Sequence, residues 1–212
     1  MNSWRAVCET VHNLALALWL GVVVSAGAFA AIVFPTMKGL NPRLPDFERY
    51  EGEHWRIAGG KIAQKVFLLA DVAQFGCAIV ALSTLLCMLV LFGLPRTRPA
   101  IWVRSLALGI ALACAAGLII IVAPQLNAAL KLHWAAAAAG DSADAAAHKL
   151  VVDGLHPVSS WLLSGTAISV LIALTTSLWS SSRAWAAPGA GVDGPGVPSP
   201  YPQPTLGRGR RA

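Results

Sequence analysis

Long runs of apolar residues dominate the chain, and few of them are interrupted by a charge. Four such runs occur, at residues 14–34, 66–94, 101–123 and 158–179. Each is long enough for a helix that crosses the hydrocarbon core of a bilayer, which takes roughly 20 residues. Backbone polar groups in lipid must be hydrogen-bonded within the segment, so each run is predicted to be a helix. The pattern therefore predicts an all-α fold, an integral membrane four-helix bundle.

The first run has an alternative interpretation as a cleaved signal peptide. Arg5 precedes it, and Ala28-Phe29-Ala30 resembles a cleavage site flanked by small residues. However, Glu9 and His12 stand directly before the run, which also continues through residues 31–34 beyond the supposed cut. These features favour an uncleaved first helix.

The composition excludes a soluble globular protein of this length. Of 212 residues, 56% are hydrophobic and only 12% are charged, about half the usual charged fraction. Much of the net charge of +6 comes from arginines in loops and in the tail, where the anionic cytoplasmic side of a membrane retains them. We therefore expect the lipid bilayer as a partner, and no nucleic acid.

The chain divides into a membrane domain and a tail. Residues 1–183 are predicted to form the transmembrane domain, and residues 184–212, rich in proline and glycine, are predicted to be disordered. The second long connection predicts a further short helix that starts at Asp141 or Ser142. Pro124 interrupts a pattern that otherwise stays helical, so the third helix is expected to kink there and to project beyond the membrane.

The basic residues predict the orientation in the membrane. The connection 95–104 holds three arginines and no acidic residue, whereas the loop 35–65 interleaves its basic residues with acidic ones. Because basic residues are retained on the cytoplasmic side, both termini are predicted to be cytoplasmic, in the inner membrane of a bacterium. Counting only the residues close to helix ends favours the opposite orientation, which stays open.

Similarity at a fixed offset suggests an internal repeat. Pro35 follows the first run as Pro124 follows the third, and Gly76 in the second run matches Gly165 in the fourth at the same offset of 89 residues. A constant offset favours two duplicated helical hairpins. The alternative is a chance match, which helices rich in alanine and leucine readily give.

Small residues recur at every fourth position of the runs. The sets are Ala17, Gly21 and Ser25; Ala73, Cys77 and Ala81; Gly109, Ala113 and Gly117; and Gly165, Ser169, Ala173 and Ser177. Such stripes let helix backbones approach closely in lipid. We therefore expect a tightly packed bundle without a wide pore.

Asp71 and His156 are the candidate site residues. Asp71 is the one acidic residue of the second run, and His156 precedes Pro157 at the start of the fourth. These two helices begin at the same membrane face, and a carboxylate in hydrocarbon needs a partner. We predict an Asp71–His156 pair that binds a proton or, with further ligands, a metal ion. The alternatives are a hydrated acid near the interface and a histidine that bonds a loop carbonyl.

No cofactor or metal site is predicted. The five histidines lack metal-site spacing and lie near helix ends or in loops, which disfavours haem. Cys77 and Cys114, with Met88 as a third ligand, are a conceivable site for a soft metal ion, but packing residues are the favoured interpretation. The four cysteines form no CxxC pair and do not suggest a disulfide framework.

The sequence carries no catalytic motif such as a nucleophile elbow, a phosphate loop or a dinucleotide fingerprint, so no enzymatic activity is expected. The leading hypothesis is a packing, assembly or accessory membrane protein that associates with itself or with another membrane protein. The alternative is a transport or resistance factor for a small solute, protons or a copper-like metal, using Asp71 and His156.

Three short motifs resemble a family of small four-helix membrane proteins catalogued as a domain of unknown function. They are HNLALALWLGVVVSAGAFAAIVFP, RIAGGKIAQKVF and GLHPVSSWLL, the last of which places His156 and Ser159 on the family's Leu-His-x-x-Ser motif. The family has bacterial members and a eukaryotic branch, with copper-resistance D-type proteins as distant relatives. The resemblance covers about residues 10–180 and implies the fold and the membrane location, but no reaction. The acidic first loop, the alanine-rich second loop and the long tail depart from the family.

Overall fold

The computed structural model describes residues 2–93 and 99–185, and every regular element in these ranges is helical. The elements are α1 (Asn2–Leu40), the 3-10 helix η1 (Pro45–Phe47), α2 (His54–Val90), α3 (Pro99–Ala116), the π-helix η2 (Gly117–Val122), α4 (Ala123–Ala139) and α5 (Ser142–Trp185). Within the described ranges, four helical segments are long and apolar enough to cross a membrane: Ser3–Leu40, His54–Val90, Pro99–Ala139 and Ser142–Ser180. The predicted all-α four-helix bundle is confirmed, and its helices are those of a multi-pass membrane protein.

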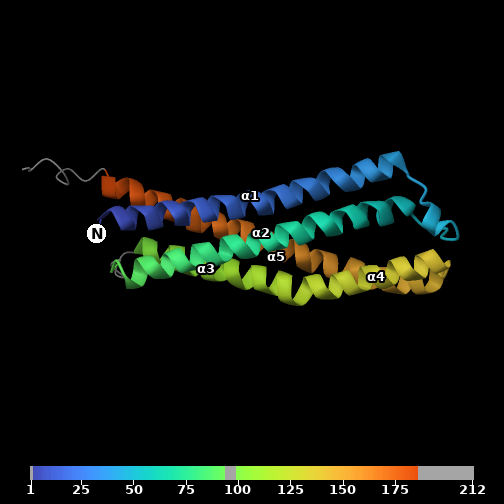
Figure 1. Ribbon diagram of the computed structural model, residues 1–212. Helices are drawn as coiled ribbons and strands as arrows, with labels where there is room; N and C mark the ends of the chain where they lie inside the picture. Colours follow the sequence, from blue (N-terminus) through green and yellow to red (C-terminus); the bar gives the residue numbers. More distant parts are fainter. Residues whose placement is uncertain (1, 94–98, 186–212) are drawn as a thin grey trace, which may run out of the picture.

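The helices form two antiparallel hairpins that lie side by side (Figure 1). α1 packs along α2, α5 packs along α3 and α4, and the hairpins meet mainly through α1 and α5. We call the end where α1 begins the N-terminal end, and the end with the connection 41–53 the loop end. Two hairpins are what the predicted duplication would produce, and the duplication itself stays a prediction.

The helices are longer than the apolar runs that predicted them. α2 begins at His54, well before residue 66, and α5 continues from Ser142 through Pro157 without a break. The 37 residues of α2 extend over roughly 55 Å, well beyond the ~30 Å of a hydrocarbon core. Hydropathy identifies only the apolar part of a helix. It therefore did not predict the more polar turns of α2 and α5 toward the loop end. Of the predicted tail 184–212, residues 184 and 185 belong to α5, and residues 186–212 lie outside the described ranges.

The third predicted helix continues past Pro124 by a change of hydrogen-bond register. A proline has no N–H to donate to the carbonyl four residues earlier. Directly before it, η2 adopts π-helical bonds, and the N–H of Ala123 donates to the carbonyl of Leu118, five residues back. The helix then runs to Ala139, so it projects well beyond its apolar run, as expected.

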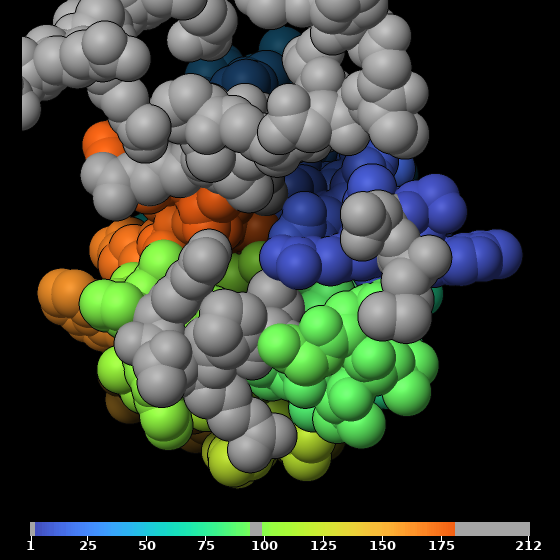
Figure 2. Space-filling model, turned by 90° about the vertical axis from the view of Figure 1, so that its left-hand side faces the viewer, coloured from blue at the N-terminus to red at the C-terminus, as the bar shows by residue number. Residues whose placement is uncertain are grey.

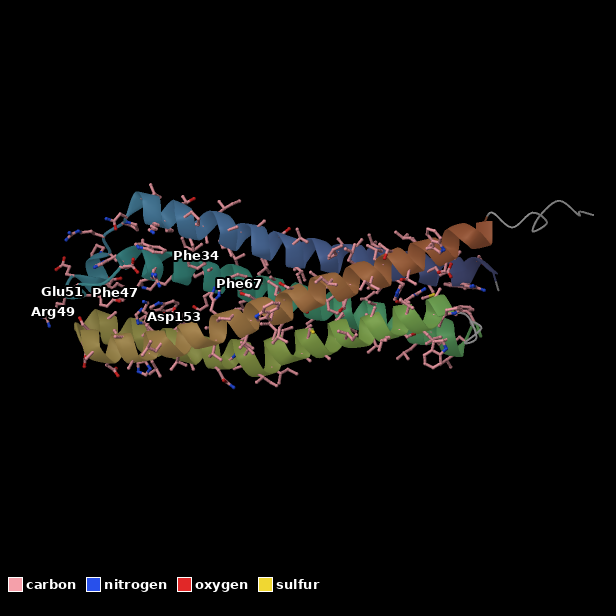
Figure 3. The ribbon with its side chains drawn as sticks, turned by 180° about the vertical axis from the view of Figure 1, so that it is seen from behind. Phe34, Phe47, Arg49, Glu51, Phe67 and Asp153 are labelled. Carbon is pink, nitrogen blue, oxygen red and sulfur yellow. The ribbon has the colours of Figure 1, made fainter. Side chains whose placement is uncertain are left out.

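Two buried clusters among the described residues hold the bundle together. The larger one lies within the apolar runs and combines alanines with Leu16, Trp19, Val23, Leu85, Leu108 and Val170. The smaller one, which we call the head cluster, lies at the loop end and consists of Phe47, Ile57, Ala136, Ala137 and Ala145. Figure 3 shows Phe47 at that end of the bundle. The part of the protein beyond the apolar runs is thus a packed unit with its own core.

The small-residue stripes do not all face the interior. On α5, Ser169 and Ala173 are buried, as the predicted packing requires. On α1, Ala17 and Gly21 are exposed, as is Ser25, because this helix turns Trp19 and its neighbours into the core instead. The expectation of close internal packing is therefore met on α5 and is wrong for α1.

Candidate functional site

The structure gives Asp71 a partner on its own helix. Asp71 is half-buried near the middle of α2, where the side-chain N–H of Gln74 donates to Asp71 Oδ1 at 3.5 Å. The side-chain oxygen of Gln74 in turn accepts from Trp19 Nε1 at 3.3 Å, and both residues are buried. A glutamine amide both donates and accepts, so it links the tryptophan of α1 to the carboxylate of α2.

His156 lies on the exposed surface of α5. Its backbone carbonyl accepts hydrogen bonds from the hydroxyls of Ser159 and Ser160, at 2.8 and 3.0 Å. In the described part of the chain, no hydrogen bond or ion pair joins its ring to Asp71. The structure does not bring the two predicted residues together by a direct bond, since α5 stays helical through Pro157 and fixes the face that His156 occupies. A role for either residue stays a prediction.

A different polar cluster lies deep in the N-terminal end of the bundle. The Arg104 side chain of α3 is 4% exposed, and His12 of α1 is fully buried. Arg104 Nε donates to His12 Nε2 at 3.1 Å, and Arg104 Nη2 lies 3.7 Å from the sulfur of Met88 on α2. We call these three residues, with Thr84, the Arg104–His12 cluster. Figure 2 views this end of the bundle, where α1, α2, α3 and α5 meet.

The hydrogen bonds fix the protonation of His12. Its Nδ1 lies 3.0 Å from the backbone carbonyl of Ala81 and 3.0 Å from the hydroxyl oxygen of Thr84. A carbonyl oxygen only accepts, so the proton must be on Nδ1. His12 Nε2 is then a free acceptor for the guanidinium of Arg104. His12 is thus a neutral imidazole that ties α1 to α2 through one nitrogen and to α3 through the other.

Arg104 is a positive charge with little compensation from carboxylates. Glu9 acts on it electrostatically, but the closest cation to that carboxylate is Arg5 at 3.8 Å, on the same helix. No ion pair involves Arg104 among the residues that the structure describes. A buried charge is stable only if hydrogen bonds replace its hydration, so the acceptor on His12 is structurally important.

A further polar contact lies next to this cluster. The Ser177 hydroxyl donates to the side-chain oxygen of Asn13 at 2.6 Å and joins α5 to α1. His12 and Asn13 are adjacent in the sequence. Their side chains join α1 to α2, α3 and α5. The N-terminal end is therefore clamped by polar contacts.

No family model, curated protein or solved structure matches this chain. The geometry of the Arg104–His12 cluster defines the chemistry that it offers. It offers a fixed cation and a neutral imidazole, and the described residues contain no group of three or more His, Cys, Asp or Glu side chains that could hold a metal ion. An arrangement of this kind can hold helices together or accept an anion.

The sequence contained a signal for this cluster that the predictions did not use. Arg104 lies within an apolar run, and antiparallel helices bring the start of the third run to the same end as His12. From the sequence, Arg104 indicates only the orientation. His12 only argues against a cleaved signal peptide and counts as one of five histidines near helix ends or in loops. An arginine inside an apolar run carries the same cost as the aspartate of α2, and it needs a partner for the same reason.

A groove lies toward the loop end, between α2 and α4. It has a volume of about 550 Å³ and is lined by Lys61, Ile62, Gln64, Lys65, Val66 and Trp134. A hydrogen bond of 3.0 Å from Gln64 to Asn127 crosses from α2 to α4 beside it. None of the predicted site residues lines this groove.

Proposed function

We propose that this chain is a non-catalytic membrane protein that acts by assembling with other transmembrane helices, first of all with a second copy of itself. The observation that supports the proposal is the outward stripe on α1. Ala17, Gly21 and Ser25 are exposed, and a side chain added at Gly21 would meet no atom within 4 Å. Small residues on a lipid-facing surface allow a second helix to approach its backbone closely.

The residues beside this stripe suit a helix–helix contact. Leu18 and Val24 flank it and are 55% and 58% exposed, so larger side chains border the small ones on the outer surface of α1. In lipid, association depends on such close packing, because lipid tails are as apolar as leucine. The same proposal places the chain in the inner membrane of a bacterium, with both termini in the cytoplasm. It also includes kinship with the four-helix family of unknown function.

Substitution of Gly21 tests this proposal. Gly21→Leu adds bulk to the stripe and is expected to weaken self-association in vesicles about tenfold, or ~1.4 kcal/mol. The measurement is energy transfer between labelled copies of the full chain as a function of protein density in the bilayer. Gly27→Leu is the matched control, because Gly27 is also an exposed glycine of α1 with open space but lies on a different face. A chain that is monomeric at every density, or equal effects of the two variants, would refute the proposal.

The second candidate function is transport of protons or small cations past Asp71. The observation that favours it is the half-buried carboxylate of Asp71, which forms no ion pair within the described residues. Asp71→Asn keeps the bond to Gln74 possible and removes the charge. A proton flux into vesicles that Asp71→Asn abolishes would support transport, and the absence of any flux in the unaltered protein would exclude it.

A further inference from the structure

Two cysteines that are far apart in the sequence touch at the N-terminal end of the bundle. The sulfur atoms of Cys8 on α1 and Cys87 on α2 lie 3.7 Å apart, although 79 residues separate them. Both side chains are half-buried, so part of each is accessible from outside. Cys87 directly precedes Met88 of the Arg104–His12 cluster, at the point where α1, α2 and α3 are tied together.

The other two cysteines have different surroundings. Cys77 lines a shallow apolar groove between α1 and α2, and Cys114 lies 3.1 Å from the position that a β-carbon on Gly165 would occupy. No hydrogen bond joins either thiol to another residue in the described ranges. Cys77 and Cys114 therefore behave as packing residues and supply an internal comparison for the Cys8–Cys87 pair.

We propose that Cys8 and Cys87 are a redox-active dithiol, which closes to a disulfide between α1 and α2 by exchange with low-molecular-weight disulfides. A disulfide has a sulfur–sulfur distance of about 2.05 Å, so the two sulfurs need to approach by less than about 2 Å in total. Rotation of the two side chains and small shifts of the first turns of α1 and the last turns of α2 can together supply this movement. The bond would lock these two helices beside Arg104.

The reaction balances without a further reactant. The thiolate of one cysteine attacks the small disulfide, forms a mixed disulfide and releases one small thiol. The thiolate of the second cysteine then attacks the protein sulfur of that mixed disulfide, and a second small thiol leaves. The two cysteines lose two electrons, the small disulfide gains them, and the two cysteine protons end on the released thiols.

This proposal does not depend on the proposed assembly function. Cys8 and Cys87 lie at the contact between α1 and α2 within one chain, whereas the stripe around Gly21 faces outward. The disulfide is read out by mass and self-association by energy transfer, so failure of one proposal leaves the other standing.

The test uses the full chain in lipid vesicles with Cys77→Ala and Cys114→Ala, so that only the contacting pair remains. One equivalent of 4,4′-dithiodipyridine is added, and released thiopyridone is followed by absorbance. If the pair closes, each molecule of probe releases two thiopyridones, and the protein keeps no adduct. The mass of the protein falls by two hydrogens, and digestion yields linked peptides that contain Cys8 and Cys87. Separate thiols instead release one thiopyridone per probe and keep a pyridyl adduct, which would overturn the proposal.

Two further variants test the importance of proximity. In the Cys87→Ser variant the second thiol is absent, so the reaction must stop after one thiopyridone is released and Cys8 must keep its pyridyl adduct. Moving the first thiol by one residue, with Cys8→Ala and Val7→Cys, places it at an exposed position of α1. Closure is expected to be at least about tenfold slower in this variant, because the second thiol is no longer held in contact. Equal closure rates, with helicity by circular dichroism unchanged, would show that the contact has no part in the reaction.

Discussion

A histidine makes the same pair of hydrogen bonds at each end of the bundle, but the donors differ in charge. At the loop end, His54 Nε2 donates to the carbonyl of Tyr50 at 2.8 Å, and its Nδ1 accepts from the backbone N–H of Leu44 at 3.1 Å. At the N-terminal end, His12 donates to the carbonyl of Ala81 and accepts from the guanidinium of Arg104. Both rings are neutral, and each ties together two segments of the chain.

The difference between the two ends lies in what replaces the histidine if it is removed. His54 is half-buried beyond the apolar runs, so water can reach the N–H that it accepts from. His12 is fully buried, and Arg104 has almost no exposed surface. An uncompensated buried charge destabilises a fold far more than a backbone N–H that finds water. The same hydrogen-bond pattern should therefore contribute very different amounts of stability.

Removal of the His12 acceptor should have the largest effect. His12→Leu keeps an apolar side chain of similar size and leaves Arg104 buried without its hydrogen-bond acceptor. The free energy of unfolding is expected to fall by about 3–5 kcal/mol, the scale for breaking one side of a buried polar contact. Reversible unfolding of the full chain in mixed micelles measures this. A loss below about 1 kcal/mol would mean that the guanidinium finds water or lipid phosphate instead.

A double variant separates the charge from the other bonds of His12. Combining His12→Leu with Arg104→Met removes the buried cation together with its acceptor, and the stability should return to within about 1 kcal/mol of the unaltered protein. If the double variant stays as unstable as His12→Leu alone, the lost stability belongs to the bonds with Ala81 and Thr84 and not to Arg104.

The matching change at the loop end should have a smaller effect. His54→Leu removes the acceptor for the N–H of Leu44, and water can take its place, so the expected loss is about 1 kcal/mol. Hydrogen exchange should accelerate at the Leu44 amide and within the head cluster, and stay unchanged around Trp19. A loss equal to that of His12→Leu would contradict the contrast between the two ends.

The four-helix fold could be predicted because it needs only the position and length of apolar runs. The contacts that hold the site could not, because they depend on the rotation of each helix about its axis. On α1, the side chain of Trp19 is buried, whereas Gly21 lies on the exposed face. Small residues at every fourth position do not indicate which of these faces is buried. The sequence shows that the carboxylate of Asp71 is costly in lipid and needs a partner. The prediction placed this partner on another helix, but Gln74 lies one turn away on the same helix.

The smallest expected effect concerns the ionisation of Tyr50 at the loop end. Burial raises the pKa of Tyr50 above its usual value of 10.0, the carboxylate of Glu53 raises it further, and Arg56 opposes the shift. A raised pKa means that the fold favours the neutral phenol, so this contribution to stability is present below pH 10 and is lost as the pH rises through the folded pKa. Because the ring is partly solvated, the effect on stability is slight.

Ultraviolet absorbance of the phenolate measures the Tyr50 shift. The chain has two tyrosines, so Tyr201→Phe leaves Tyr50 as the single signal. The midpoint should lie above pH 10, and Glu53→Gln should bring it closer to that value. Tyr50 is partly buried and packs against the head cluster. A midpoint at or below pH 10 in the folded protein would contradict this burial.

The protonation state of His12 tests the central claim most directly, since the N-terminal end is held by a neutral histidine that accepts from a buried arginine. Solid-state ¹⁵N NMR of histidine-labelled full-length protein in bilayers distinguishes protonated from bare ring nitrogens, and a His12→Gln sample assigns the signal among the five histidines. We expect a protonated Nδ1 and a bare Nε2 that couples to the Nε proton of Arg104. A proton on Nε2, whether alone or together with one on Nδ1, would contradict the account.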